Sequence, residues 1–491
     1  MSGIAGILSS NGKNHLNEIL DKIKHRGSTD PSIWVGPNAA LGITQLENLN
    51  EHPGLVISPQ AQRGIIWDGR LTNKQALLEE IKFHTIKDES DAEVVLHLYE
   101  DLGTRVIGRL EGEFSLAIVE QDHFLLARDR LGIRPLYYGF AEGALCFASE
   151  IKGLIGLVEK VHEFLPGNFL ISNWGLFPYE PYFPKSIQLN GAIDSAERLA
   201  ENLETAVQRA IRGKPEVGVW LSGGVDSSVI AALARPFVDR LHTFSTGIEG
   251  APDIEYARQV AEHIGAQHHE RLYTLEEMQS VIEKVIYHLE SFDAPLVRST
   301  IANYLVSELT ADYVPFALSG EGGDELFAGY AYQKSYNSEV ELTLSVQESI
   351  ASLHNSALQR VDRSAAAHGI GSAVPFLDPD VVRYALAIPA RWKIRGAQSI
   401  EKWPLRQGLA HTLPDEVIWR GKSKFWEGAG SGEMMADVAE KEIPDDVFLA
   451  ARDLGNGEQL RSKEELRYYE IFHQFYGESV PLHQVWRTAH I

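Results

Sequence analysis

Residues 219–233 read VWLSGGVDSSVIAAL. An apolar run ends at Leu221, a loop rich in serine and glycine occupies residues 222–228, and an apolar helix-like pattern follows. Glycines allow a turn in which successive backbone N–H groups converge, and such groups at a helix N-terminus attract anions. Asp226 can hold a Mg²⁺ ion that neutralises phosphate charge. The loop adds hydroxyl donors from Ser222, Ser227 and Ser228. The order of strand, loop and helix predicts a phosphate-binding loop that lacks the lysine of the Walker motif.

Residues 317–332, ALSGEGGDELFAGYAY, repeat this order of an apolar run followed by a glycine loop. The loop carries three carboxylates, Glu321, Asp324 and Glu325. Clustered carboxylates serve as metal ligands or as groups with shifted pKa values, and apolar residues on both sides argue against a merely solvated loop. We expect this stretch to form the second half of the phosphate site.

Basic residues are concentrated near the end of an otherwise acidic chain. They are Arg406, Arg420, Lys422 and Lys424. A lysine in this region could stabilise a departing pyrophosphate, whereas a basic helix end would account for only some of these residues.

The pattern of residues 189–491 predicts a doubly wound parallel sheet in an α/β domain with a helical C-terminal part. An amphipathic helix over 196–213 precedes a strand at 217–222, and strands and helices then alternate. Such alternation is typical of a parallel sheet with helices on both faces. From about residue 330 onward the pattern is mainly helical.

Residues 1 to about 180 instead contain many short strand-like runs. Two apolar runs within 115–129 flank the sequence EQDH and predict a hairpin, and residues 91–103 predict one amphipathic helix that ends at a glycine. The stretch 174–191 carries three prolines and several aromatic residues, which is typical of a linker. We therefore expect two domains, 1–188 and 189–491.

Composition narrows the classes of function. The chain has 491 residues and a net charge of 45 − 68 = −23, which argues against a nucleic-acid binder. Its single cysteine, Cys146, excludes an intrachain disulfide and a cysteine zinc cluster, and fits a reducing cytoplasm. No charged leader or membrane-length apolar run is present, so we expect a cytoplasmic protein with no membrane partner.

Several motifs resemble the glutamine-dependent asparagine synthetases along nearly the whole chain. The second half carries LSGGVDSS, SGEGGDELFAGY, VPFLD, EKWPLR and WRGKSKF, which are similar to the ATP-pyrophosphatase (PP-loop, HUP-like) synthetase domain of that family. The first half carries SGIAGIL, HRGSTDP, WDGRLTN, SDAEVVLHLYE, LEGEFSLAIVE and ARDRLGIRPLYYG, which are similar to its glutaminase domain. The resemblance implies an αββα sandwich of the N-terminal nucleophile (Ntn) type, followed by the α/β domain.

The resemblance also implies roles for residues in the second half. Asp226 and Asp324 would bind Mg²⁺, Glu321 would act as the base for the attacking amine, and Lys422 would face the phosphates. Related β-lactam synthetases carry a tyrosine where this chain has Glu321, so the glutamate favours a small amine as nucleophile. The ATP-binding residues would be Leu221, Ser222, Gly223, Gly224, Asp226, Ser227, Ser228, Thr246, Ser319 and Gly320.

The glutaminase site departs from the family pattern. The family has a cysteine nucleophile after Met1, whereas this chain has Ser2, a much weaker nucleophile unless it is strongly activated. Gln45 stands where an arginine grips the glutamine carboxylate, and Asp68 replaces an oxyanion-hole asparagine. Gly69 and Asp91 remain. These changes predict a degenerate glutamine site, and a retuned hydrolase with Ser2 as catalytic nucleophile is the alternative.

A further departure concerns the acceptor acid. The family commonly has a glutamate and an arginine just before VPFLD, where this chain has Gly371 and Ala373. Loss of the arginine favours a larger or less charged carboxylate than aspartate.

Three classes of function therefore stay open. The leading one is an ATP-dependent amide-forming ligase that adenylates a carboxylate, with ammonia or another amine as second substrate. Asparagine synthesis from free ammonia, amidation of another acid and condensation with a larger amine are its three versions. An Ntn amidohydrolase using Ser2 and a non-catalytic scaffold are the others. The family resemblance also suggests a homodimer.

Overall fold

This computed structural model describes residues 2–9, 13–47, 54–58, 62–121, 123–172, 175–182, 187–396, 399–421, 434–455, 457–485 and 487–488. The chain forms two compact units. The first comprises Met1–Pro181 with His473–Val485, and the second comprises Tyr182–Phe472 with Trp486–Ile491. The return of His473–Val485 to the first unit is fixed by hydrogen bonds such as that from Val161 N to Ser479 O, at 2.9 Å.

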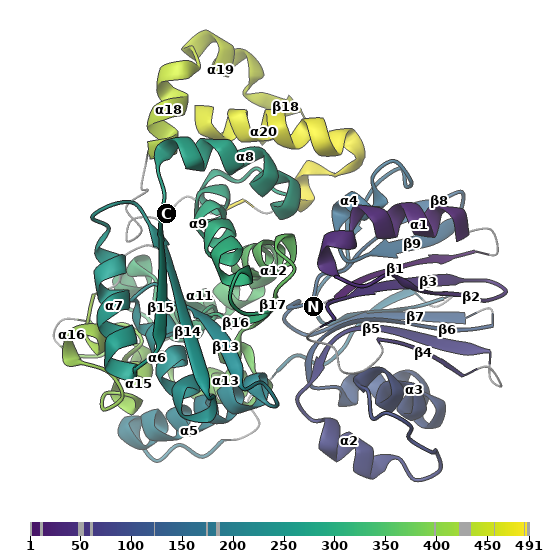
Figure 1. Cartoon of the computed structure of the whole chain (residues 1–491), viewed down its shortest axis with the longest axis horizontal. Coiled ribbons are helices and arrows are strands. Elements are labelled where there is room, and N and C mark those ends of the chain that lie inside the picture. Colours follow the sequence, from purple (N-terminus) through teal and green to yellow (C-terminus); the bar gives the residue numbers. More distant parts are fainter. Residues whose placement is uncertain are drawn as a thin grey trace. The chain divides into compact units, whose positions relative to one another are not determined.

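The first unit contains two antiparallel sheets of six strands each (Figure 1). The first sheet has the order β10-β8-β9-β1-β3-β2 and the second has the order β12-β11-β7-β6-β5-β4. The strands of the first sheet are β1 (Ser2–Leu8), β2 (Ser32–Val35), β3 (Ala40–Gln45), β8 (Tyr137–Ala141), β9 (Ala144–Ala148) and β10 (His162–Glu163). The strands of the second sheet are β4 (Leu55–Ser58), β5 (Arg63–Leu71), β6 (Gly112–Glu120), β7 (His123–Arg128), β11 (Asn168–Ile171) and β12 (Gly175–Pro178).

Helices cover the outer face of each sheet. Helices α1 (Lys13–Lys22) and α4 (Ile151–Leu154) pack on the first sheet, and α3 (Asp91–Leu102), with α2 (Lys74–Glu80) beside it, packs on the second. Apolar side chains from both sheets, including Ile4, Ile66 and Phe147, form the core between them. The expected αββα sandwich is confirmed, as are the hairpin of β6 with β7 and the helix α3 that ends at Gly103.

The second unit is built on a parallel five-stranded sheet of order β15-β14-β13-β16-β17. Its strands are β13 (Glu216–Trp220), β14 (Arg240–Gly247), β15 (Gln267–Leu272), β16 (Phe316–Leu318) and β17 (Gly371–Ala373). The chain runs outward from β13 to β15 and then returns to β16 beside β13, so the strand order reverses between β13 and β16. This reversal confirms the predicted doubly wound sheet and makes its carboxyl edge the expected ligand site.

Two pairs of helices flank this sheet (Figure 1). Helices α6 (Val225–Ala234) and α7 (Pro252–Ile264) pack together on β13, β14 and β15, whereas α9 (Ala294–Ala311) and α12 (Ala357–Ala367) pack together, α9 on β14 and α12 on β17. Right-handed crossovers put these pairs on opposite faces. Four further helices belong to this layer structure: α5 (Ala192–Ile211), α8 (Leu275–Leu289), α13 (Pro379–Ala387) and α15 (Trp403–Gly408).

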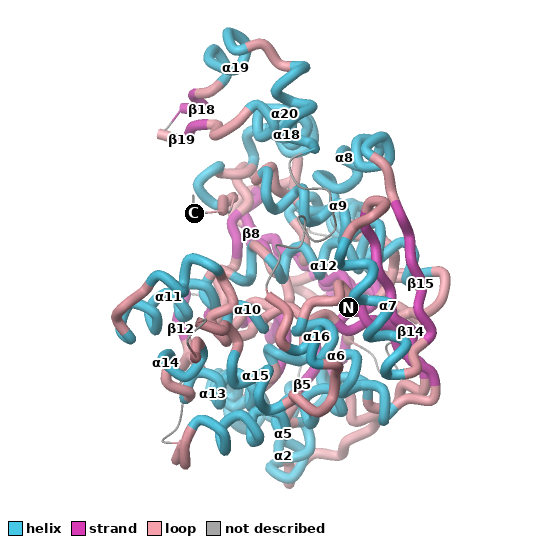
Figure 2. The backbone as a smooth tube through the Cα atoms, turned by 90° about the vertical axis from the view of Figure 1, so that its left-hand side faces the viewer, coloured by secondary structure: helices cyan, strands magenta, loops and turns pink. Residues whose placement is uncertain are grey.

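The remainder of the second unit is mainly helical, as expected. Helices α18, α19 and α20 gather beside the small hairpin β18–β19, and α18 packs on α8 (Figure 2). The bounds are α10 (Gly323–Leu326), α11 (Glu339–Ala351), α14 (Ala390–Lys393), α16 (Asp415–Ile418), α18 (Met434–Glu442), α19 (Asp445–Ala451), β18 (Asp453–Gly455), β19 (Glu458–Gln459) and α20 (Lys463–Tyr476). Among the described residues, no helix is both long and apolar enough to cross a bilayer.

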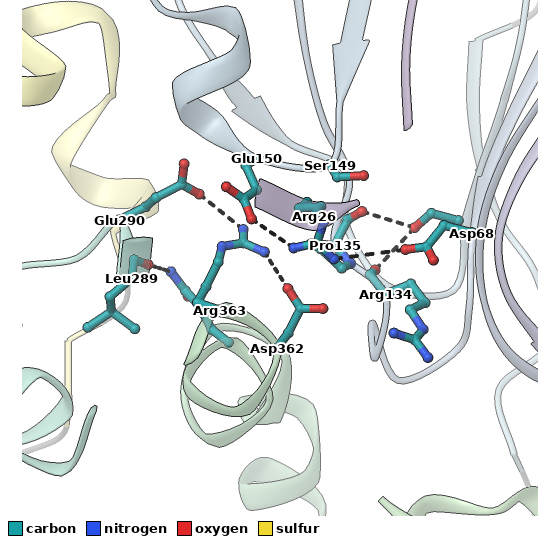
Figure 3. Close-up of polar contacts among 12 residues, drawn as sticks. Arg26, Asp68, Arg134, Pro135, Ser149, Glu150, Leu289, Glu290, Asp362 and Arg363 are labelled. Atoms are coloured by element: carbon teal, nitrogen blue, oxygen red, sulfur yellow. Dashed lines mark hydrogen bonds and ion pairs between the residues drawn. The ribbon is translucent and has the colours of Figure 1, made fainter. Parts of the chain in front are cut away.

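A buried ion cluster anchors α12 in the second unit. The guanidinium of Arg363 donates to Asp362 at 2.7 Å and to Glu290 at 3.0 Å (Figure 3). All three side chains are nearly inaccessible to water. Removing one partner of such a cluster leaves buried charges without compensation.

We expect Arg363→Met to lower the free energy of unfolding by about 3–5 kcal/mol, because it removes a buried cation that contacts two buried carboxylates. Chemical denaturation followed by tryptophan fluorescence measures this change. Arg198→Met is the matched control. Because Arg198 forms an exposed ion pair with Glu201, this substitution should lower the free energy of unfolding by less than about 1 kcal/mol. Equal effects of the two substitutions would contradict the account.

Candidate active site

The carboxyl ends of β13 and β16 bring the two glycine loops together. The backbone at Gly320 lies so close to the first loop that a Cβ there would stand 2.8 Å from the backbone nitrogen of Ser227. A Cβ at Gly323 would stand 2.6 Å from the Cγ of Asp226. A side chain at Gly320 would therefore collide with backbone, and one at Gly323 would displace Asp226. The structure thus brings the two predicted loops against each other.

The first loop turns sharply and then opens α6. Gly223 has φ of +71°, and a Cβ there would meet Tyr256 and the backbone of α7 within 2.8 Å. The hydroxyl of Ser227 lies 3.1 Å from both the backbone nitrogen and the hydroxyl of Ser222, and it donates to Gly224 O. These bonds fix the loop, while the first turn of α6 presents backbone N–H groups suited to a phosphate.

The neighbouring strand β14 supports the same loop. Leu221 N donates to Phe244 O at 2.8 Å, and Ser245 Oγ donates to Leu221 O at 2.5 Å. Thr246, expected at the nucleotide, is buried near the end of β14, and its hydroxyl donates to Ala302 O on α9. Ser319 N donates to Ala373 O on β17, which joins the second loop to the sheet edge.

The central electrostatic feature of the site is a lysine between the two predicted metal ligands. The ammonium of Lys402 contacts the carboxylate of Asp226 and lies 2.7 Å from Asp324 Oδ1. Burial opposes the charge on Lys402, but the two carboxylates outweigh it and raise the pKa of Lys402 well above its usual range. Two carboxylates that already converge on one cation also fit the oxygen ligand set of Mg²⁺.

Sequence reasoning did not single out Lys402, although it lies in the EKWPLR motif. It has the left-handed backbone conformation, with φ of +56° and ψ of +27°, immediately before α15. Its backbone nitrogen donates to Phe327 O, so this turn is fastened to the chain that follows α10. The unusual conformation holds the side chain at the carboxylates.

Two other acids of the second loop have different environments. Glu321 contacts the guanidinium of Arg360 on α12, which holds its carboxylate in place. Glu325 is buried and accepts a hydrogen bond from the hydroxyl of Tyr330. Burial, together with the charges of Asp324 and Glu321, raises the pKa of Glu325 to about 7.

The basic residues near the end of the chain have separate tasks. Arg406 is buried and donates to the carbonyls of Glu401, Ile418 and Arg420. Its guanidinium therefore organises backbone around the turn that precedes α15 and the segment after α16. Arg420 reaches the first loop, where it donates to Gly223 O and pairs with Asp253 at 2.6 Å. Lys422 and Lys424 lie outside the described residues.

The sheet edge beside Ser319 is uncharged. Gly371, Ser372 and Ala373 form β17 and are all buried. The strand therefore carries no cation at either position where the family commonly has a charged residue.

In the first unit, Ser2, Gln45 and Asp68 lie together. Ser2 is paired with Gln45 in the register of β1 and β3, and its backbone nitrogen donates to Asp68 Oδ1 at 2.7 Å. Ser2 and Asp68 are both buried. Arg26 donates to Ser2 O at 3.0 Å and to Glu150 at 2.7 Å, and it lies 4.0 Å from Asp68 (Figure 3).

The two retained residues of this site are Gly69, which follows Asp68 on β5, and Asp91, whose side chain contacts the end of that strand. Gly69 has φ of +151°, and a Cβ there would stand 2.1 Å from Glu113 O. Asp91, at the start of α3, accepts a hydrogen bond from Leu71 N at 2.8 Å. Burial raises the pKa of Asp91, although that hydrogen bond and Lys74 oppose the shift.

Comparison with known proteins identifies the class. A family model described as asparagine synthase matches residues 198–355 and 337–489, and one described as a glutamine amidotransferase domain matches residues 1–170. An amidotransferase-type sandwich joined to an ATP-using synthetase unit defines an ATP-dependent carbon–nitrogen ligase. The chain belongs to the asparagine synthetase family.

Individual relatives cover almost the whole chain. Asparagine synthetase B (glutamine-hydrolyzing) of Escherichia coli strain K12 is 32% identical over 485 residues, which is 94% of this chain and 87% of that protein. Asparagine synthetase (glutamine-hydrolyzing) 3 of Arabidopsis thaliana is 29% identical over 98% of this chain and 88% of its own. The glutamine phosphoribosylpyrophosphate amidotransferase from B. subtilis, solved with ADP and GMP, has a TM-score of 0.32 and 18% identity, over 55% of this chain and 65% of its own.

The raised pKa of Glu325 predicts a pH-dependent stability. The folded state keeps the proton to about pH 7, whereas the unfolded chain releases it near pH 4.5, so the stabilisation is complete below pH 4.5 and lost as the pH rises through 7. Between pH 5 and 8 the free energy of unfolding of the wild type, measured with urea, should fall by about 2–3 kcal/mol relative to that of Glu325→Gln. The exposed Glu348→Gln control should keep the wild-type slope, and parallel curves for the wild type and Glu325→Gln would exclude this titration.

Proposed function

We propose that this chain uses ATP to activate a carboxylate and then joins it to ammonia or another small amine, and that its glutaminase activity has been lost. The carboxylate oxygen attacks the α-phosphorus of ATP while the bond to the β-phosphate oxygen breaks and pyrophosphate leaves. The amine nitrogen then attacks the acyl carbon, and AMP leaves as the amide forms.

The residues of the second unit support the first step. The loop of residues 222–228 and the N-terminus of α6 suit the phosphates, and Asp226 and Asp324 would hold Mg²⁺. When bound, the metal neutralises phosphate charge. Lys402 orients both carboxylates, and it supplies a positive charge beside the phosphate loop.

Glu321 suits the second step. As the amine attacks, a proton must leave its nitrogen, and a carboxylate at this place can accept it. The contact with Arg360 keeps the Glu321 side chain in one orientation. The uncharged strand 371–373 supports a carboxylate substrate that needs no cation from this strand. Aspartate would fit only if another group of the protein paired with its second carboxylate.

The single observation that carries the loss of glutaminase is the Asp68 carboxylate, 2.7 Å from the backbone nitrogen of Ser2. An Ntn nucleophile needs its own α-amine as the base that takes the hydroxyl proton. After removal of Met1, a buried carboxylate this close stabilises the protonated ammonium form, which cannot accept a proton. Asp68 also places negative charge where an oxyanion would develop.

The second candidate is a glutamine-hydrolysing enzyme with Ser2 as its nucleophile. The names of the bacterial and plant relatives state that those proteins hydrolyse glutamine. Retention of Gly69 and Asp91, together with the burial of Ser2 at the start of β1, favours this candidate. The nitrogen donor distinguishes the two candidates: the second takes nitrogen from glutamine, whereas the first takes it from ammonia or another small amine.

Pyrophosphate release from ATP and Mg²⁺ tests the proposal, with aspartate and a panel of other carboxylates, each supplied with ammonium or with glutamine. We expect turnover with ammonium and none with glutamine, and no change in the ammonium rate for Ser2→Ala. Turnover with glutamine that Ser2→Ala abolishes would establish the second candidate. Failure of every acid to release pyrophosphate would instead favour a scaffold.

Glu321→Gln tests the assignment of the base. We expect amide formation to fall about 10²–10⁴-fold, the usual worth of a general base, because the isosteric amide cannot accept the proton. Carboxylate-dependent exchange of labelled pyrophosphate into ATP should persist, since this exchange needs only the first step. An equal loss of both activities would assign Glu321 to the first step or to folding, and Glu348→Gln serves as the exposed control.

A further inference from the structure

The first unit contains a cluster of histidine and acid that the proposed reaction does not use. Within the described part of the chain, one group of three histidine, cysteine or acidic residues places a ligand atom of each within 4.8 Å of the others. The group is His84, His97 and Glu100. His97 and Glu100 are one turn apart on α3, and His84 comes from the segment of residues 81–90 that joins α2 to α3.

Both imidazoles direct the same ring atom to one carboxylate oxygen. His97 Nδ1 lies 2.8 Å from Glu100 Oε2, and His84 Nδ1 lies 3.3 Å from it. The two rings stack, with their centroids 4.6 Å apart and their planes 20° apart. Tetrahedral zinc sites with metal–ligand bonds near 2.0–2.1 Å separate their N and O ligands by about 3.3 Å, close to the two distances found here. Because an ion lies in the plane of each ring that binds it, one of the two stacked rings must turn for both nitrogens to reach one ion.

The outer ring nitrogen of His84 has the kind of partner that metal-bound histidines usually have, whereas the carboxylate that faces the outer nitrogen of His97 lies beyond hydrogen-bond distance. His84 Nε2 lies 3.0 Å from Asp101 Oδ1, and His97 Nε2 lies 3.9 Å from Glu93 Oε1. Carboxylates in this position fix the ring orientation and raise the basicity of the ligating nitrogen. Glu93 is itself held by three backbone N–H groups of residues 87–89.

Charge and access also favour a cation. Three carboxylates surround the two rings, while one nearby cation, Arg63, lies 3.0 Å from Glu100 Oε1, the oxygen that faces away from the histidines. The three side chains of the cluster are 14–22% exposed, so an ion from solvent can reach them. Imidazole with carboxylate suits Zn²⁺ and its first-row neighbours better than Mg²⁺.

We propose that His84, His97 and Glu100 bind one divalent transition-metal ion of the zinc class. The ion would fasten the segment of residues 81–90 to α3. It is independent of the ATP site in the second unit, because no residue is shared. The alternative is a metal-free set of polar contacts between the two histidines and the acids.

Untagged full-length protein, stripped with a chelator and kept in excess Mg²⁺ to occupy the ATP site, is titrated with Zn²⁺ by calorimetry, and bound metal is counted by mass spectrometry. We expect one zinc per chain in the wild type and affinity more than about 100-fold weaker in His97→Gln and in His84→Gln. Asp101→Asn should weaken binding about 10–100-fold, as loss of an outer partner does.

His15→Gln is the matched control. His15 also pairs with a glutamate three residues on, at 3.6 Å from Glu18, but is exposed and lacks a second histidine. It should bind zinc as the wild type does. Circular dichroism checks that each variant is folded, and Glu100→Gln replaces any variant that is not. Absence of zinc binding at micromolar concentrations, or equal binding by the wild type and both histidine variants, would overturn the proposal.

Discussion

One ion cluster holds the synthetase centre together: the ammonium of Lys402 between the carboxylates of Asp226 and Asp324. It joins three segments that are far apart in sequence, namely the loop after β13, the loop after β16 and the turn before α15. Two carboxylates this close would repel one another without a cation. The lysine therefore lets both acids stand at the place where the doubly wound sheet reverses, and where a nucleotide is expected to bind.

In the first unit, by contrast, an acidic side chain stands beside the expected nucleophile. Ser2 lies at the start of β1, a strand held between β3 and β9. The acid beside Ser2 adds a negative charge where an Ntn hydrolase needs a neutral amine and an oxyanion donor. The core of this sandwich is made of residues from both sheets and does not include Ser2. The fold of the first unit therefore does not depend on whether Ser2 reacts.

Much of this could be predicted from sequence because the signals are local. The predicted phosphate loop can be recognised because a strand, a glycine turn and a helix follow one another within fifteen residues. The alternation of strands and helices after this loop implies the parallel sheet. Lys402 could not be predicted, because it lies 176 residues from Asp226 and neither periodicity nor spacing links them. The return of His473–Val485 to the first unit depends on backbone hydrogen bonds to residues such as Val161, which leave no pattern in the sequence. The structural role of Arg406 could not be predicted either, because composition does not distinguish an exposed guanidinium from one enclosed by carbonyl groups.

The most direct test of the account is to follow which nitrogen enters the product. Protein, ATP, Mg²⁺ and the active acid are incubated with ¹⁵N-ammonium and unlabelled glutamine together, and the amide product is analysed by mass spectrometry. The account predicts that all product nitrogen is ¹⁵N, at a rate that glutamine does not change. Unlabelled amide in the product of the wild type, absent from that of Ser2→Ala, would contradict it, because that nitrogen would then come from glutamine hydrolysed at Ser2.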